Sequence, residues 1–226
     1  MQLSLCVLIL GWVKMNYTPI FFTSIGIVQV KENTDILQKY NGEWMRTTKE
    51  GAKGLTSSMS RNYRVLESYP EIKKILLNYF ISLSSDILGL DQKFAMSTSW
   101  LTKTEKGDET FLHNHRNSFW SGVYYYGEEY GEDSCIEFTN PLQERIKDNC
   151  FSIVPAKETQ FSSMNADNPA IRVEARKNKL ILFPSYIKHK IIQGNDNSPR
   201  YSLAFNIVPI GKYGRADSTY DTSWFN

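Results

Sequence analysis

Apolar positions recur at two different periods along the chain, near the helical period in its first part and at strand-like spacing afterwards. The clearest helix is predicted over residues 67–89, where Pro70 suits a first turn and Gly89 suits a stop. We expect its apolar face to pack against a sheet. That face consists of Ile72, Ile75, Leu76, Tyr79, Phe80 and Leu83.

Three weaker patterns precede this helix. Residues 19–30 are rich in Ile, Phe and Val, which predicts a strand. Residues 33–45 place apolar side chains close to the helical period, which predicts a second helix. Residues 47–60 are rich in Gly, Ser, Thr and Lys, which predicts a loop.

From Phe94 onward, short β-prone runs are separated by turn-rich segments. Such spacing is typical of a sandwich or barrel of antiparallel strands. The pattern therefore predicts one domain with a mainly β fold and flanking helices. In it, residues 15–93 form a strand and helical support region, residues 94–210 a jelly-roll core, and residues 211–226 a polar tail. The β-prone runs are residues 94–101, 110–115, 119–126, 135–138, 152–155, 171–174, 180–183, 189–193 and 201–208.

The composition agrees with one globular domain. The 226 residues are 41% hydrophobic and 13% aromatic, which is enough for a sizeable core. The net charge of +2, without a dense run of Lys and Arg, does not indicate a nucleic-acid module. Cys6, Cys135 and Cys150 are odd in number and form no C-x-x-C, which argues against a disulfide framework and a zinc ribbon. A reducing cytoplasm is the simplest setting.

The first residues raise the question of where the protein starts. Residues 1–13 are apolar but too short to span a bilayer, and they lack the basic region and the cleavage site of a signal peptide. We therefore expect no membrane anchor. Met15 is a second candidate start, because residues 16–23 read as an ordinary domain opening. Residues 1–14 are then either an extension from a mis-assigned start or an additional strand.

All three histidines of the chain stand where they can form a metal site. His113 and His115 end a β-prone run, and residues at i and i+2 of a strand point to the same face. His189 follows the apolar run 179–188. Neutral imidazole is a common ligand of iron, zinc, copper and nickel. Arg200 comes soon afterwards in a strand-like segment, which indicates a metal beside a bound carboxylate.

These residues belong to a longer set of motifs that resembles a known family. The motifs are His113-Asn-His115 followed by residues 117–126, then Leu182-Phe-Pro-Ser185 before His189, and residues 199–206. Together they resemble the 2-oxoglutarate- and Fe(II)-dependent oxygenases of marine phages and bacteria. The resemblance runs from about Met59 to Val208 and includes Ser99-Trp100.

The resemblance implies a double-stranded β-helix, a cupin-like jelly roll, with Fe(II) and 2-oxoglutarate between its sheets. It implies an enzyme that uses O2 to hydroxylate or oxidise a substrate, with release of succinate and CO2. The setting is then a cytoplasm, that of the host if a phage encodes the protein. The prime substrate is not evident from the sequence.

The resemblance also assigns roles to individual residues. Arg200 is expected to bind the distal carboxylate of 2-oxoglutarate, because a guanidinium suits bidentate contact with a carboxylate. Ser202 lies two residues further on the same strand face and can donate a hydroxyl to the same group. Tyr125 can offer its phenol from a neighbouring strand.

His113 and His189 take the first and the distal ligand positions, while His115 departs from the family. The wider superfamily places Asp or Glu at the position of His115. His115 is therefore either a third ligand, which its spacing from His113 favours, or an outer group beside a water ligand. Three histidines alone would suit zinc as well as iron.

Two other functions fit parts of the pattern. A cupin-type metalloenzyme without 2-oxoglutarate also uses H-x-H with a distal histidine, although cupins commonly place a Glu a few residues later, where this chain has residues 116–120. A non-catalytic jelly-roll binding module would share the fold, but it would not explain three converging histidines.

Overall fold

Two antiparallel sheets that face each other make up most of the structure. The computed structural model describes residues 7–10, 13–16, 23–46, 57–106, 108, 110–128, 130–131, 133–141, 170–192 and 199–225. The larger sheet has the strand order β3-β10-β7-β12-β6-β5-β4. Its strands are β3 (Gly26–Gln29), β4 (Trp44–Arg46), β5 (Ser58–Ser60), β6 (Lys93–Thr104), β7 (Trp120–Tyr125), β10 (Lys179–Pro184) and β12 (Arg200–Ile210).

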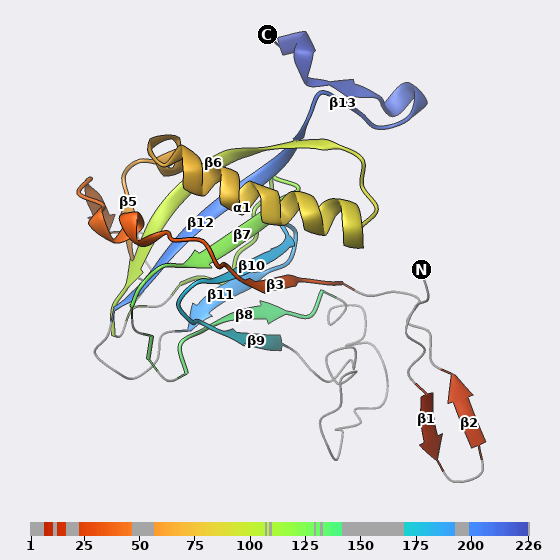
Figure 1. Cartoon of the computed structure of the whole chain (residues 1–226), viewed down its shortest axis with the longest axis horizontal. Coiled ribbons are helices and arrows are strands. Elements are labelled where there is room, and N and C mark those ends of the chain that lie inside the picture. The colour runs from red at the N-terminus through yellow and green to blue at the C-terminus, as the bar shows by residue number, and fades with distance from the viewer. Residues whose placement is uncertain are drawn as a thin grey trace.

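The smaller sheet has the order β11-β8-β9 and lies on one side of the larger sheet, while the helix α1 (Pro70–Ser82) lies across its other side (Figure 1). The strands of the smaller sheet are β8 (Cys135–Thr139), β9 (Ala170–Glu174) and β11 (His189–Ile192). Two short hairpins complete the strands. They are β1 (Val7–Leu10) with β2 (Val13–Asn16), and β13 (Lys212–Tyr213) with β14 (Tyr220–Asp221).

Strand β7 shows how this arrangement makes two cores. All six of its residues are buried, because the strand is covered on both faces. Trp120 and Tyr124 belong to the core under α1, whereas Val123 and Tyr125 belong to the core between the two sheets. The predicted mainly β, jelly-roll architecture with a flanking helix is confirmed.

The predicted helix over residues 67–89 is confirmed in its central part. It begins with the 3-10 turn η2 (Val65–Ser68), continues as α1 and ends in the π-helical turn η3 (Leu83–Ile87). Gly89 stops it with a φ of +65°, a conformation that favours glycine. Within α1, the fully buried side chains are Ile72, Leu76 and Phe80.

The predicted helix over residues 33–45 is wrong. The chain forms only the 3-10 turn η1 (Asp35–Lys39), in which Leu37 is the one buried residue, and then enters β4. Asn41 and Gly42 interrupt the helical pattern, and Trp44–Arg46 is extended because it pairs with β5. Sheet pairing outweighs the weak helical spacing here.

The β-prone runs match the strands with one exception. Residues 110–115 contain a single bridge, His113 to His189, and not a continuous strand. The predicted run 152–155, residues 19–22 of the predicted strand 19–30 and residues 47–56 of the predicted loop 47–60 lie outside the described residues. The strand prediction is confirmed only for β3, and the loop prediction is wrong at residues 58–60, which form β5 because they pair with β4 and β6. In the described chain, the two remaining short helices are η5 (Ala216–Ser218) and η6 (Thr222–Phe225), and no helix is long and apolar enough to cross a membrane.

The core under α1 should be sensitive to truncation of Phe80. This side chain is fully buried and packs edge-on against Phe94 at 5.0 Å between ring centroids. Phe80→Ala should destabilise the protein by about 3–5 kcal/mol, because it opens a cavity. Denaturant unfolding monitored by circular dichroism measures the change.

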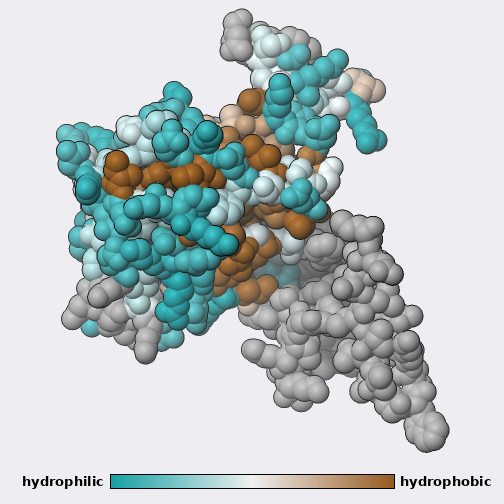
Figure 2. Space-filling view, in the orientation of Figure 1, coloured by the Kyte–Doolittle hydropathy of each residue, from teal (hydrophilic) through white to brown (hydrophobic). Residues whose placement is uncertain are grey.

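Ile81, the next residue, is a matched control. Its side chain is 44% exposed, and Figure 2 shows apolar atoms reaching the surface on the face that carries α1. Ile81→Ala should cost less than about 1 kcal/mol. Equal losses for the two variants would contradict the placement of α1 on the sheet.

Candidate active site

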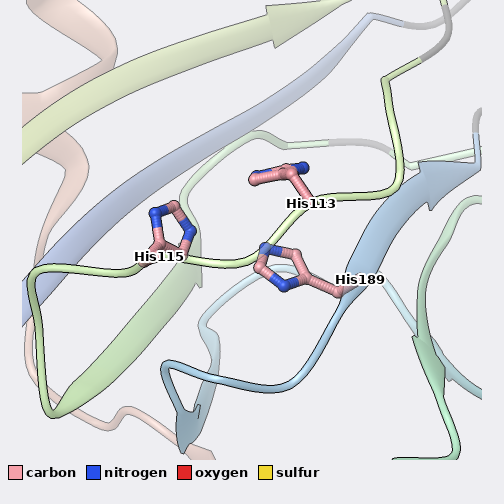
Figure 3. A group of neighbouring side chains, drawn as sticks. All are labelled: His113, His115 and His189. Carbon is pink, nitrogen blue, oxygen red and sulfur yellow. The ribbon is translucent and has the colours of Figure 1, made fainter.

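The three histidines converge at the edge where the two sheets meet (Figure 3). His113 and His115 lie on the loop before β7, and His189 is the first residue of β11. Their ring centroids are 4.5 Å apart for His113 and His189, and 5.2 Å apart for each of the other two pairs. One ligand atom from each ring can be chosen so that all three lie within 4.8 Å of one another. This is close enough for one metal ion to contact all three rings.

Backbone hydrogen bonds orient two of the rings. Nδ1 of His113 lies 2.8 Å from the carbonyl oxygen of Phe111, and Nδ1 of His189 lies 3.0 Å from that of Ile187. A carbonyl only accepts, so each Nδ1 carries the proton and leaves the lone pair of Nε2 for a metal. The ring of His115 packs against Trp100, with centroids 5.7 Å apart.

Burial keeps two of the imidazoles neutral. Burial first, and the nearby His113 second, lower the pKa of His189 to about 3 and the pKa of His115 to about 4. A neutral imidazole is the form that binds a metal. His113 is the exposed member of the group, which leaves the metal position open on its side.

Arg200 is the largest fully buried side chain of the described structure. It begins β12, and its Nη2 donates a hydrogen bond to the phenol oxygen of Tyr125 at 2.7 Å. Its Nε and Nη1 have no hydrogen-bond partner among the described residues, nor does Oγ1 of Thr104, which faces Arg200 across the β12–β6 pair. A buried cation with two free donors is costly unless it receives an anionic partner.

A cavity of about 170 Å³ adjoins the histidines. Ser202 is buried and lines it, whereas Arg200 does not, although both side chains lie on the same face of β12. The remaining wall is mainly apolar and uncharged. It is formed by Ser57, Met59, Trp100, Thr102, Thr110, Gly122, Val123, Ile136, Phe183, Ile191, Ala204 and Phe205 with the three histidines.

Thr104 was not anticipated from the sequence, in contrast to Arg200, Ser202 and Tyr125. Its proximity to Arg200 depends on the register between β6 and β12, which the local pattern does not encode. A larger cavity of about 610 Å³ lies on the opposite face of the sheet, beside Tyr126 and Tyr201, and none of the predicted site residues lines it.

Comparison with known families accounts for this arrangement. Residues 98–206 match the family model described as "Putative 2OG-Fe(II) oxygenase". The chain carries a 2OG-Fe(II) oxygenase domain. It is therefore an enzyme that uses Fe(II) and 2-oxoglutarate to oxidise a substrate that is not yet identified. The matched region contains all three histidines, Tyr125, Arg200 and Ser202.

Solved structures of similar fold include oxygenases and an epimerase. The epimerase SnoN from nogalamycin biosynthesis has a TM-score of 0.58 at 12% identity, covering 84% of this chain and 80% of SnoN. HygX from Streptomyces hygroscopicus with nickel and 2-oxoglutarate bound has a TM-score of 0.53 at 11% identity, covering 83% of both chains. A prolyl hydroxylase from Trichoplax adhaerens has a TM-score of 0.53 at 12% identity, covering 81% of this chain and 83% of that one. No curated protein sequence matches the chain. At these identities the structural likeness shows the fold alone.

The residues of the oxygenase fit both groups that the family uses. Three imidazoles converge with the geometry of a metal site, and the orphaned donors of Arg200 call for an anion in the space between the sheets. The departure from the superfamily at His115 is thus accommodated by the structure, since this ring joins the cluster and does not point away from it.

The metal-free oxygenase should lose stability as the pH falls from 7 to 5. The unfolded chain protonates His189 near its ordinary pKa of 6.5, whereas the fold keeps this ring neutral down to about 3. The folded state then binds fewer protons, so its stability decreases as the pH falls, by on the order of 2 kcal/mol at pH 5. Thermal melts of metal-free protein should show a smaller pH-dependent loss in His189→Asn. An equal loss in both proteins would contradict the burial of a neutral ring.

Proposed function

We propose that this oxygenase holds Fe(II) through His113, His115 and His189 and holds 2-oxoglutarate through Arg200. The supporting observation is that a buried guanidinium and a cluster of three imidazoles occur together in the space between the two sheets. A buried guanidinium with two free donors lies on the same strand face as Ser202, which shares a cavity with the three imidazoles. The guanidinium fits a carboxylate, and the three imidazoles fit a divalent metal.

Bound Fe(II) and 2-oxoglutarate supply the oxidising power for attack on a C–H bond, with O2 consumed and succinate and CO2 released. The task of the protein is to orient and shield them. Arg200, with Tyr125 and Ser202, fixes the distal carboxylate of 2-oxoglutarate. The apolar walls at Val123 and Phe183 exclude water from the cavity.

The ligand set determines how strongly the site attracts an anion. Three neutral imidazoles bring no charge, so the metal position keeps a full +2, whereas a carboxylate at the position of His115 would reduce it by one. The dianionic cosubstrate then supplies the first negative charges that the metal meets. We infer tight electrostatic coupling between metal binding and 2-oxoglutarate binding.

The prime substrate has to be found by experiment. HygX has been solved with hygromycin B bound, and the Trichoplax prolyl hydroxylase with a peptide, so the shared fold accepts unlike substrates. Succinate release, measured against pools of peptides, nucleosides, sugars and lipids, identifies the class. On the cysteine pattern, we place the reaction in a reducing cytoplasm, that of the host if a phage encodes the protein.

The ligand assignment predicts the iron content of three variants. His113→Ala and His189→Ala should each abolish iron binding and turnover, because two imidazoles hold Fe(II) poorly. His115→Asp should retain iron, because it restores the superfamily's common ligand. Iron per protein after anaerobic reconstitution is the measurement. Asn114→Ala is the matched control, since Asn114 lies between the pair and, among the described residues, its side chain donates to the carbonyl of Tyr186 alone. Iron near the wild-type level in both alanine variants would exclude this site.

The cosubstrate assignment predicts a selective loss in Arg200→Gln. Iron affinity should be nearly unchanged, while 2-oxoglutarate should bind roughly 10- to 100-fold more weakly, because a charge-assisted hydrogen bond is worth about 1.5–3 kcal/mol. Arg200→Lys should rescue only partly, since lysine lacks the planar fork. An anaerobic titration that follows the metal-to-cosubstrate charge-transfer band measures the affinity.

Arg172→Gln is the matched control for charge alone. Arg172 is exposed on β9 and pairs with Glu137, away from the cavity. Its loss should leave 2-oxoglutarate affinity unchanged. If wild type and Arg200→Gln bind 2-oxoglutarate equally, Arg200 does not belong to the site, and the reading as a cupin-type metalloenzyme regains support.

A further inference from the structure

His115 differs from the other two histidines in how its ring is held. The Nδ1 atoms of His113 and His189 each face a backbone carbonyl two residues earlier in the chain. Within the described part of the chain, no hydrogen bond orients the ring of His115, which contacts Trp100 and its two histidine neighbours. A metal ligand without such a bond depends on its backbone for orientation.

That backbone is tied to Ser185 from both ends of the loop. The N–H of His115 donates to the carbonyl of Ser185 at 3.0 Å, and the N–H of Ser185 donates to the carbonyl of Phe119 at 3.1 Å. Ser185 is 1% exposed and directly follows β10. The backbone of one buried residue, Ser185, thus holds both ends of the loop from His115 to Phe119.

The hydroxyl of Ser185 is the centre of a hydrogen-bond relay. Ser118 donates to Ser185 at 2.9 Å, the hydroxyls of Ser185 and Ser121 are 2.8 Å apart, and Ser121 donates to Oδ1 of Asn206 at 2.8 Å. Because Ser121 uses its proton on Asn206, its oxygen accepts the proton of Ser185. The hydroxyls of Ser185 and Ser121 then each donate once and accept once.

The relay ends on rigid parts of the sheet. Ser121 lies in β7 and Asn206 in β12, and Nδ2 of Asn206 donates to Oγ1 of Thr98 in β6 at 3.0 Å. The loop is therefore fastened through side chains to three adjacent strands of the larger sheet. The same turn that begins at Ser185 leads to Ile187, whose carbonyl orients the ring of His189.

We propose that Ser185 is a positioning residue for His115. Its hydroxyl fixes the loop against the sheet and so replaces the ring hydrogen bond that His115 lacks. This inference rests on the proposed function, since it takes His115 as a metal ligand. It assigns to the serine that follows the Leu-Phe-Pro segment a role in shaping the metal site, in addition to its role in the turn.

Co(II) binding to the metal-free protein tests the proposal, because its visible spectrum reports the number and geometry of ligands. Ser185→Ala should weaken Co(II) binding roughly 10- to 100-fold and shift its bands towards those of His115→Ala. Ser121→Ala, which removes the next link of the relay, should act in the same direction. Ser185→Thr, which keeps a hydroxyl, should restore affinity in part.

Ser99→Ala is the matched control. Ser99 is also buried, and its hydroxyl accepts a hydrogen bond from the N–H of Leu66 at 2.9 Å, on the opposite face of β6 from the relay. Its loss should leave the Co(II) affinity and spectrum unchanged even where the melting temperature falls. A change in Co(II) binding as large as that of Ser185→Ala would overturn the proposal.

A double-mutant cycle separates positioning from general stability. In a His115→Ala background, Ser185→Ala should cause no further loss of Co(II) affinity, because its effect passes through His115. An equal loss in both backgrounds would overturn the positioning role. Loss in His115→Ala but none in Ser185→Ala or Ser121→Ala would also overturn it, while leaving the ligand set intact. An unchanged Co(II) spectrum in His115→Ala would instead refute His115 as a ligand, which is a failure of the proposed function.

Discussion

The reciprocal backbone hydrogen bonds between His113 and His189 are the constraint on which the rest of the site depends. The N–H of each residue donates to the carbonyl of the other, at 3.0 Å and 2.8 Å. His189 pairs with Phe138 in the smaller sheet, while the N–H of Phe119, at the far end of the loop, donates to Ile207 in the larger sheet. The loop that carries His113 and His115 thus joins the two sheets. A metal held there lies where the sandwich is closed, on strand ends that are fixed by pairing.

Electrostatics explains why such a site favours an anionic cosubstrate. The imidazoles of His115 and His189 are neutral, and the guanidinium of Arg200 is buried with two of its nitrogens unpaired. With a divalent metal bound, the space between the sheets contains positive charge that no described residue of the cavity wall compensates. Burying such charge costs free energy that a dianionic ligand offsets when it binds.

The parts of the structure that local sequence patterns encode were predictable, and those that depend on register were not. The 3.6-residue spacing of Ile72, Leu76 and Phe80 was sufficient to place α1. The spacing over residues 33–45 was misleading, because pairing of Trp44–Arg46 with β5 decides that segment. Thr104 and the hydroxyl relay of Ser185 bring together residues from distant strands, so their proximity depends on how those strands align.

Strand β12 shows how the hydrophobic core fixes the direction of the functional side chains. Leu203, Phe205 and Ile207 are fully buried in the core under α1, so the alternate positions, from Arg200 and Ser202 to Asn206, point into the space between the sheets. A slip of β12 by one residue would bury the polar set under the helix and would move the apolar set into the cavity. The burial of three apolar side chains therefore opposes any register in which the cosubstrate residues face away from the metal.

The register shift between Asn206 and Ile207 lets β6 turn Phe94 and Met96 to the helix side while Thr98, Trp100, Thr102 and Thr104 keep the cavity side. The alternation of apolar and polar side chains along β12 thus specifies both the core on one face of the strand and the functional residues on the other.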